Sequence, residues 1–281
     1  MNKTIKTLVA LLPLFITSCY NDDTTVTTNP QQDRVVAVNA GITREGNSTT
    51  GSAFANNDKI LITNVTRKNA GLICNSAVFT YDGSSWTSEG TLLWSAGEEN
   101  TFQAVYPSTA SYSSFIVPSD QSTEENFKSA DWMTCEKKVT LNNLTDASSL
   151  ELTFERKMAM VVVEITEADV STLNSLTVES PSPDNNITFE NPDHKITAYK
   201  DANTGNMFSA IIAPGSKGKD AILCTLKLSD STEKSLTLQN KIDFQAGKKY
   251  TFQCSLTSQP DSAPTRSASP DNLTLVSVEP M

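Results

Sequence analysis

The chain has 281 residues and a formal net charge of -10, with 32 acidic and 22 basic side chains. This acidity disfavours nucleic acid and anionic lipid as partners, because both carry dense negative charge. One histidine and five dispersed cysteines also disfavour a zinc site, and we predict no metal and no cofactor.

The N-terminus has the pattern of a secretory leader. Lys3 and Lys6 precede an apolar stretch at residues 8–16, which is shorter than the roughly 20 residues that a membrane-spanning helix needs. Residues 16–19, Ile-Thr-Ser-Cys, resemble the bacterial lipobox. The resemblance implies a signal peptide of residues 1–18 and lipidation of Cys19, whose acyl chains would hold the protein at a membrane. The alternative is an ordinary secretory signal that contains a cysteine.

A polar stretch follows the leader. Residues 19–33 are rich in Asn, Asp, Thr, Gln and Pro, and they offer almost nothing to bury. Such a composition is typical of a solvated linker. We therefore predict that these residues tether the first folded domain to the lipid.

Short runs that alternate apolar and polar residues predict β-strands from residue 34 onward. A first series covers residues 35–38, 59–63, 77–81, 101–106 and 114–117, and a second covers 150–154, 158–165, 176–178, 187–189, 195–199, 207–213, 222–228 and 249–256. Residues 81–84, Tyr-Asp-Gly-Ser, predict a hairpin, because Asp-Gly tolerates the positive φ of tight turns.

Length and the lack of helical periodicity set the fold class. About 260 residues remain after the leader, which is enough for two domains that each bury a core. We predict an all-β fold of two tandem β-sandwiches, at residues 34–145 and 146–258.

The last segment differs from everything before it. Residues 259–281 begin as a linker with three prolines and continue into a β-prone run that contains Leu273, Leu275, Val276 and Val278. A terminal strand on a flexible linker suits donation to another molecule. The alternative is a tail without a role.

Four cysteines remain after Cys19, and no two of them are close in sequence. Cys224 and Cys254 fall in neighbouring predicted strands, which makes them the best-placed pair for a disulfide in an oxidising compartment. Buried thiols acting as small apolar groups are the alternative for this pair and for Cys74 and Cys135. The sequence leaves both open.

Motifs of catalysis are missing from the sequence. The only histidine, His194, stands in a turn context, and there is no Gly-x-Ser-x-Gly, P-loop or His-Glu-x-x-His pattern. Trp86, Trp94 and Trp132 could stack on a sugar, although packing in a core is the commoner use of tryptophan. We predict a protein that is not an enzyme.

Several motifs in order resemble the fimbrillins, the type V pilin subunits and their adhesin-like relatives. The matching segments are Tyr-Asp-Gly at residues 81–83, Phe-Gln-Ala-Val-Tyr-Pro at 102–107, the strand and turn at 152–159, and Ala-Gly-Lys-Lys-Tyr at 246–250. The chain departs from the family pattern at Asn57, where glycine is usual, at Arg156, where histidine is usual, and at Glu45, where a small residue is commoner.

The resemblance implies two transthyretin-like β-sandwiches secreted as a lipoprotein precursor. It implies a protease cut between Arg44 and Glu45, loss of the strand at residues 35–42, and a groove that a strand of the next subunit fills. The donor strand would be the one with Leu273, Leu275, Val276 and Val278. The alternative for Arg44 is a surface arginine in a loop, and Glu45 weakens the case for cleavage.

We therefore expect a non-catalytic fimbrial subunit or fimbria-associated lipoprotein, exposed on the outer membrane through Cys19 and serving adhesion. Its partners would be other fimbrial subunits, in a homo- or heteropolymer, and a host or bacterial surface ligand, but not nucleic acid. The alternative is a monomeric lipoprotein that binds a cell-surface glycan or host ligand.

Overall fold

The computed structural model describes residues 34–42, 54–95, 99–141, 149–166, 169–183, 186–256 and 271–281. Regular structure in these ranges is β-strand, apart from the short helices α1 (Val65–Asn69) and α2 (Glu124–Ser129) and the 3-10 turn η2 (Val170–Thr172). The all-β prediction is confirmed. Cys19, Arg44 and Glu45 lie outside the described residues, so lipidation and cleavage stay predictions.

The first sheet has seven strands in the order β1-β8-β7-β5-β2-β3-β4. Their bounds are β1 Val38–Ile42, β2 Lys59–Asn64, β3 Ser76–Tyr81, β4 Trp86–Ser88, β5 Glu99–Tyr106, β7 Met133–Thr140 and β8 Leu150–Arg156. Strands β1 and β8 are parallel, and the other neighbours are antiparallel. The predicted hairpin is confirmed between β3 and β4, where Gly83 takes a φ of +93°.

The second sheet has nine strands in the order β12-β10-β16-β17-β20-β19-β9-β14-β13. Their bounds are β9 Ala159–Thr166, β10 Leu173–Glu179, β12 Lys195–Thr197, β13 Tyr199–Lys200, β14 Met207–Ile212, β16 Ile222–Leu228, β17 Glu233–Leu238, β19 Lys248–Ser255 and β20 Asp271–Pro280. Two small sheets pair β6 (Phe115–Val117) with β11 (Ile187–Phe189) and β15 (Gly215–Lys217) with β18 (Ile242–Phe244).

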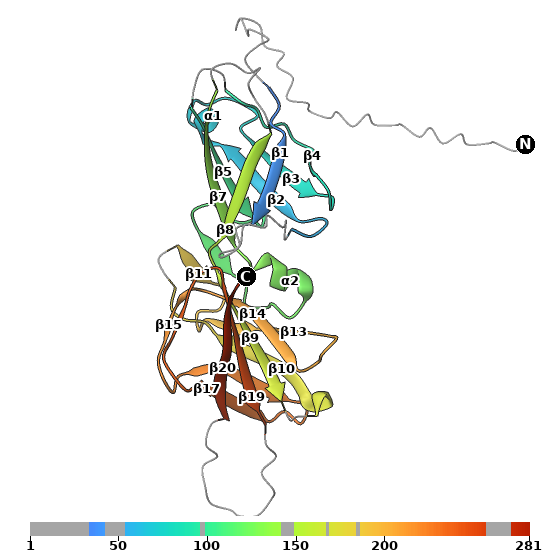
Figure 1. Cartoon of the computed structure of the whole chain (residues 1–281), viewed down its shortest axis with the longest axis vertical. Coiled ribbons are helices and arrows are strands. Elements are labelled where there is room, and N and C mark those ends of the chain that lie inside the picture. Colours follow the sequence, from blue (N-terminus) through green and yellow to red (C-terminus); the bar gives the residue numbers. More distant parts are fainter. Residues whose placement is uncertain are drawn as a thin grey trace, which may run out of the picture.

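The two large sheets enclose separate hydrophobic cores, which lie one above the other in Figure 1. Phe102 and Phe154 are fully buried in the first core, and Phe208 and Phe252 are buried in the second. We call the two parts the first and the second region. Alternation along each strand produces this arrangement, because every second side chain points to the same face of a sheet.

The chain crosses between the regions more than once. The segment between β5 and β7 packs on the second core through Phe115, Val117, Ala130 and Trp132. The chain then returns along β7 and β8 and enters the second region at β9. The domain boundary between residues 145 and 146 stays a prediction. That prediction did not include the segment between β5 and β7, which packs on the second core.

Both short helices begin at a polar capping residue. The Asn64 side chain accepts a hydrogen bond from the Arg67 N–H at the start of α1, and the Thr123 hydroxyl accepts one from the Asn126 N–H at the start of α2. Within the described ranges, neither helix is long or apolar enough to cross a membrane.

Candidate functional site

The N-terminal segment, residues 34–42, joins two parts of the first region. Strand β1 pairs with β8 along its whole length. Upstream, the Val36 N–H donates to the Leu92 carbonyl at 2.9 Å, and the Trp94 N–H donates to the Arg34 carbonyl at 2.9 Å. One short segment therefore fills the space between β8 and residues 92–94.

Apolar side chains hold this segment in place. Val36, Ala40 and Ile42 are buried in the first core, and Ala40 and Ile42 stand beside Leu152 and Phe154 of β8. Removing the segment would uncover this side of β8. The result would be an apolar groove flanked by unpaired backbone groups, which is what an incoming strand can fill.

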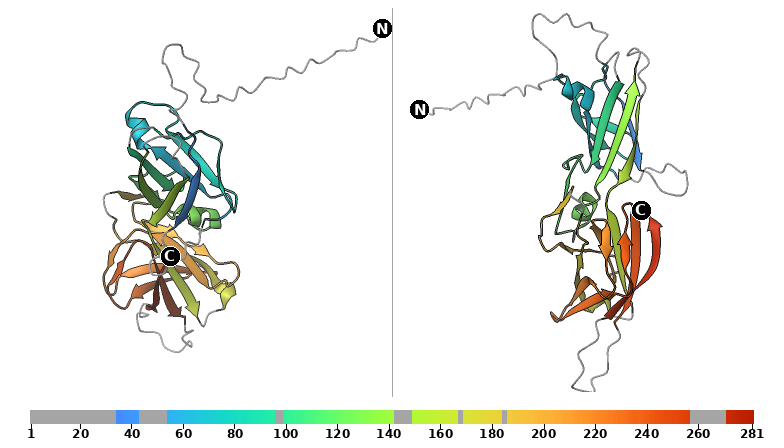
Figure 2. Two further views of the ribbon diagram at one scale, coloured as in Figure 1. Left: turned by 45° about the horizontal axis from the view of Figure 1, so that its top comes forward. Right: turned by 90° about the vertical axis from the view of Figure 1, so that its left-hand side faces the viewer.

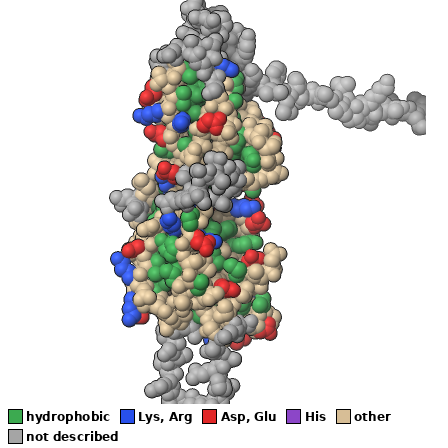
Figure 3. Space-filling view, in the orientation of Figure 1, with side chains coloured by type: hydrophobic (Ala, Val, Ile, Leu, Met, Phe, Trp, Pro, Cys, Tyr) green, Lys and Arg blue, Asp and Glu red, His purple; other side chains and the backbone are tan. Residues whose placement is uncertain are grey.

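The C-terminal strand β20 lies inside the second sheet of its own molecule. It runs antiparallel to β19 along most of its length and parallel to β17 at residues 271–273. Its apolar side chains are unequally buried: Leu273 is 1% exposed, whereas Leu275, Val276 and Val278 are 37%, 53% and 49% exposed. Figure 3 shows hydrophobic side chains on the face of the second region where β19 and β20 lie. Backbone pairing thus holds most of this strand.

The exposure of these side chains has a topological cause. Leu275 and Val278 stand opposite Phe252 and Tyr250 of β19, which are both buried. Beyond Leu273, however, β20 has no strand partner on its outer side among the described residues. The register also shifts between Thr251 and Phe252, which leaves Val276 as an extra residue. This half of β20 is a sheet edge with apolar side chains, a typical site for pairing with another chain.

Polar contacts fix the end of β20 where the two regions meet. The Met281 N–H donates to the Gly247 carbonyl at 2.9 Å, and the Arg156 guanidinium donates to the Met281 carbonyl at 3.1 Å. Arg156 also forms an ion pair with Asp131 at 2.8 Å, and the second oxygen of Asp131 is buried without a partner. Burial raises the pKa of Asp131 despite the neighbouring guanidinium.

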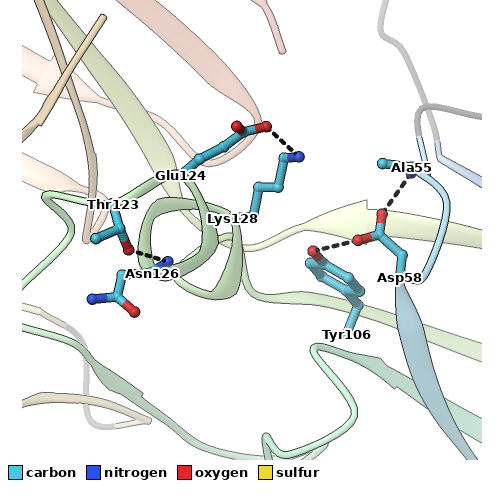
Figure 4. A network of polar contacts seen from close by, with 7 residues as sticks. All are labelled: Ala55, Asp58, Tyr106, Thr123, Glu124, Asn126 and Lys128. Carbon is cyan, nitrogen blue, oxygen red and sulfur yellow. Dashed lines mark hydrogen bonds and ion pairs between the residues drawn. The ribbon is translucent and has the colours of Figure 1, made fainter. Parts of the chain in front are cut away.

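A second polar group lies at the same junction. The Tyr106 hydroxyl donates to Asp58 at 3.2 Å, and the Ala55 N–H donates to the other Asp58 oxygen at 2.7 Å. Figure 4 shows this group facing α2, where Glu124 and Lys128 form an ion pair. Burial and the Asp58 charge raise the pKa of Tyr106. These contacts orient the ends of strands and bring no nucleophile to a base.

Cys224 and Cys254 are reduced, buried thiols in the structure, as are Cys74 and Cys135. Burial, helped by the nearby Cys254, raises the pKa of the Cys224 thiol. A disulfide formed in an oxidising compartment stays a prediction.

The residues considered for catalysis and sugar binding have structural places. His194 lies in a turn with a φ of +58°, and its ring stacks on Phe189 at a centroid distance of 4.4 Å. Trp86, Trp94 and Trp132 are buried, which confirms packing in a core. Among the described residues, no group of three or more His, Cys, Asp or Glu side chains could hold a metal ion.

The sequence did not identify the polar residues that shape these sites. Arg156 was noticed only as a departure from a family pattern, and its contacts with Asp131 and Met281 join residues far apart in the chain. Nothing in the sequence marked Arg67, whose guanidinium is buried.

The fold is an all-β structure with two cores, and a terminal strand pairs into the sheet of each. Comparisons with known proteins identify the family to which this fold belongs. A fimbrillin-like family model matches residues 43–277. The chain therefore belongs to the fimbrillin-like family, as the motifs indicated. No curated protein matches the chain.

Solved structures share the fold. A Bacteroides ovatus protein provisionally assigned to cell adhesion aligns with a TM-score of 0.60 and 13% identity, covering 88% of this chain and 97% of the other. A Bacteroides uniformis protein with the same provisional assignment aligns with a TM-score of 0.54 and 17% identity, covering 88% and 98%. At these identities the likeness concerns the fold alone.

Proposed function

We propose that this chain is a non-catalytic fimbrial subunit, or a fimbria-associated surface lipoprotein, that assembles by strand exchange and serves adhesion. Membership of the fimbrillin-like family supports the fimbrial role. The observation that carries the proposal is the unequal hold on the two terminal strands. The N-terminal segment buries Val36, Ala40 and Ile42, whereas β20 exposes Leu275, Val276 and Val278 to solvent.

The groove would form by removing the buried strand. A cut between Arg44 and Glu45 would separate residues 34–42 from the rest of the chain, and their departure would uncover the β8 side of the first core. A donor strand would then bury several Leu and Val side chains there, at about 1.5–3 kcal/mol each before ordering costs. That sum is enough for a durable joint between subunits.

The donor would be β20 of a neighbouring subunit. In the single molecule, its release costs the burial of Leu273 and the backbone pairing with β17 and β19. Leu275 and Val278 would lose little on release and would gain burial in the groove of the neighbour. Pairing within the molecule would thus protect β20 until a groove becomes available.

The cellular setting follows from the leader. Lipid on Cys19 would anchor the uncut chain at the outer membrane, exposed on the surface. A chain cut after Arg44 would lose this anchor on joining the fimbrium, whereas a chain that is never cut would stay anchored as a fimbria-associated lipoprotein. The partners would be other fimbrial subunits, in a homo- or heteropolymer, and a host or bacterial surface ligand.

One observation favours a second function. Because β20 is paired within its own molecule, the folded chain is also consistent with a monomeric lipoprotein that binds a cell-surface glycan or host ligand. Such a protein would never exchange strands. It would keep residues 34–42 in place for its whole life.

A double substitution separates the two functions. Leu275→Asp with Val278→Asp places charges where the monomer is more than one third exposed, so folding should be retained, but a buried groove would reject them. In cells that assemble the protein, we expect the polymer ladder on gels to be lost while surface levels stay unchanged. Ile222→Asp is the matched control, because Ile222 is equally exposed on β16. A normal ladder from the double variant would favour the monomeric binder.

A further inference from the structure

An exposed apolar turn follows α1 in the first region. Leu72 and Ile73 are 44% and 51% exposed, and Val35, in the neighbouring N-terminal segment, is 63% exposed. Figures 1 and 2 place α1 and the start of this segment at the end of the molecule away from the second region. We call Val35, Leu72 and Ile73 the apolar tip.

A buried arginine holds this turn in one shape. The guanidinium of Arg67 donates to the Ile73 carbonyl through Nε at 3.3 Å and Nη2 at 3.0 Å, and to the Trp94 carbonyl through Nη1 at 3.2 Å. The Asn75 side chain donates to the Leu72 carbonyl at 2.7 Å. Arg67 therefore binds the turn to the backbone that also pairs with the N-terminal segment, since the Trp94 N–H donates to the Arg34 carbonyl.

The combination is unusual for a purely structural turn. Burying a guanidinium is costly unless its donors are satisfied, and here they are satisfied by the carbonyls of the turn. Yet the two side chains that the turn presents are apolar and point to solvent. A rigid apolar protrusion is what contact with an apolar phase or surface requires.

The position of the tip selects the partner. Residue 34 begins the described part of the first region, and the predicted lipid on Cys19 is about 15 residues away, a reach of at most roughly 50 Å. The exposed residues beside the tip include two basic ones, Arg34 and Lys68. Glu99 reaches the same area, because its carbonyl accepts a hydrogen bond from the Thr66 hydroxyl of α1 at 2.9 Å, and its carboxylate lies 3.7 Å from Lys138.

We propose that Val35, Leu72 and Ile73 form a membrane-contacting tip that inserts among the headgroups of the bilayer to which the chain is tethered. This inference rests on the proposed lipid anchor and concerns the uncut chain, because a cut after Arg44 would remove both Val35 and the tether. Three side chains bind a bilayer weakly, but a short tether raises their effective concentration to the millimolar range. The negative charge of the whole chain disfavours an anionic surface, so the committed partner is a zwitterionic one, whose phosphates Arg34 and Lys68 can approach.

A probe on the tip tests insertion directly. The full chain without its leader, with Cys19→Ser and an N-terminal hexahistidine tag, is bound to phosphatidylcholine vesicles containing nickel-chelating lipid. An environment-sensitive dye is attached at Leu72→Cys, since the four native thiols that remain are buried. We expect a severalfold rise in emission on vesicle binding. The same dye at Ile116→Cys, 62% exposed on β6 of the second region, should show none.

A second substitution makes the result specific. Ile73→Asp in the Leu72→Cys chain should abolish the rise without releasing the protein from the vesicles, because it adds a charge to the inserting surface. Equal emission changes at positions 72 and 116, or a rise that survives Ile73→Asp, would overturn the inference. Because the tag replaces lipidation and no polymer is needed, failure here is distinct from failure of the lipid anchor or of strand exchange.

Discussion

The N-terminal and C-terminal segments resemble each other in role and differ in how they are held. Each segment pairs with two parts of the chain. Residues 34–42 pair with residues 92–94 and with β8, and β20 pairs with β17 and with β19. The first buries Val36, Ala40 and Ile42, whereas the second buries only Leu273 among its β-prone apolar residues. Side-chain burial therefore secures the first, and backbone pairing secures most of the second.

This difference separates two kinds of strand release. Burial of apolar side chains is a large term that backbone cleavage alone does not remove, so residues 34–42 leave slowly unless a better occupant replaces them. Backbone pairing at a sheet edge contributes less per residue and opens by local unfolding. The asymmetry suits a subunit that keeps its groove closed and its donor strand within reach.

The largest effect is expected at the junction that fixes the end of β20. Arg156→Ala leaves the Asp131 carboxylate buried without its partner and should lower the free energy of unfolding by about 3–5 kcal/mol, measured by urea denaturation. Asp131→Asn combined with Arg156→Met should recover most of the loss. A small effect of Arg156→Ala would show that this ion pair does not secure the junction.

Equivalent truncations should distinguish the two segments. Ile42→Ala opens a cavity in the first core and should cost about 2–4 kcal/mol, whereas Val278→Ala on β20 should stay within about 0.5 kcal/mol. Urea denaturation of both variants measures the difference. Similar losses of unfolding free energy in the two variants would contradict the proposed difference between the N-terminal segment and β20.

The smallest effect concerns an exposed ion pair on β20. Lys249 lies 2.8 Å from Glu279 and lowers the pKa of that carboxyl. Because the folded pKa is depressed, the pair helps to hold β20 above the ordinary pKa of glutamate, and this help is lost as the pH falls through the depressed value. Hydrogen exchange of β20 should therefore be faster in Glu279→Gln than in the wild type at pH 7. A difference that persisted at low pH would exclude the ion pair as its cause.

The strands were largely predictable because their alternation is local. The predicted strands at residues 187–189 and 222–228 have the same bounds as the observed β11 and β16. The β-prone C-terminal run forms β20. Strands β7 and β17 were missed, as were both helices. Helices α1 and α2 have five and six residues, too few for a periodicity, and only their caps Asn64 and Thr123 could have marked them.

The partners of the strands were not predictable. That β20 would lie between β17 and β19 of its own molecule depends on contacts between residues distant in sequence. The same is true of the Arg67 and Arg156 contacts, because an arginine in a sequence is read as solvated unless its buried partners are known. Long-range pairing and buried charge are thus where sequence patterns give least information.

Hydrogen exchange of the intact chain, followed by mass spectrometry, tests the central asymmetry most directly. The account predicts that amides of β20 beyond Leu273 exchange well before those of residues 38–42, because the former open locally and the latter are held by the first core. Equal protection of the two segments, or earlier exchange of residues 38–42, would contradict it.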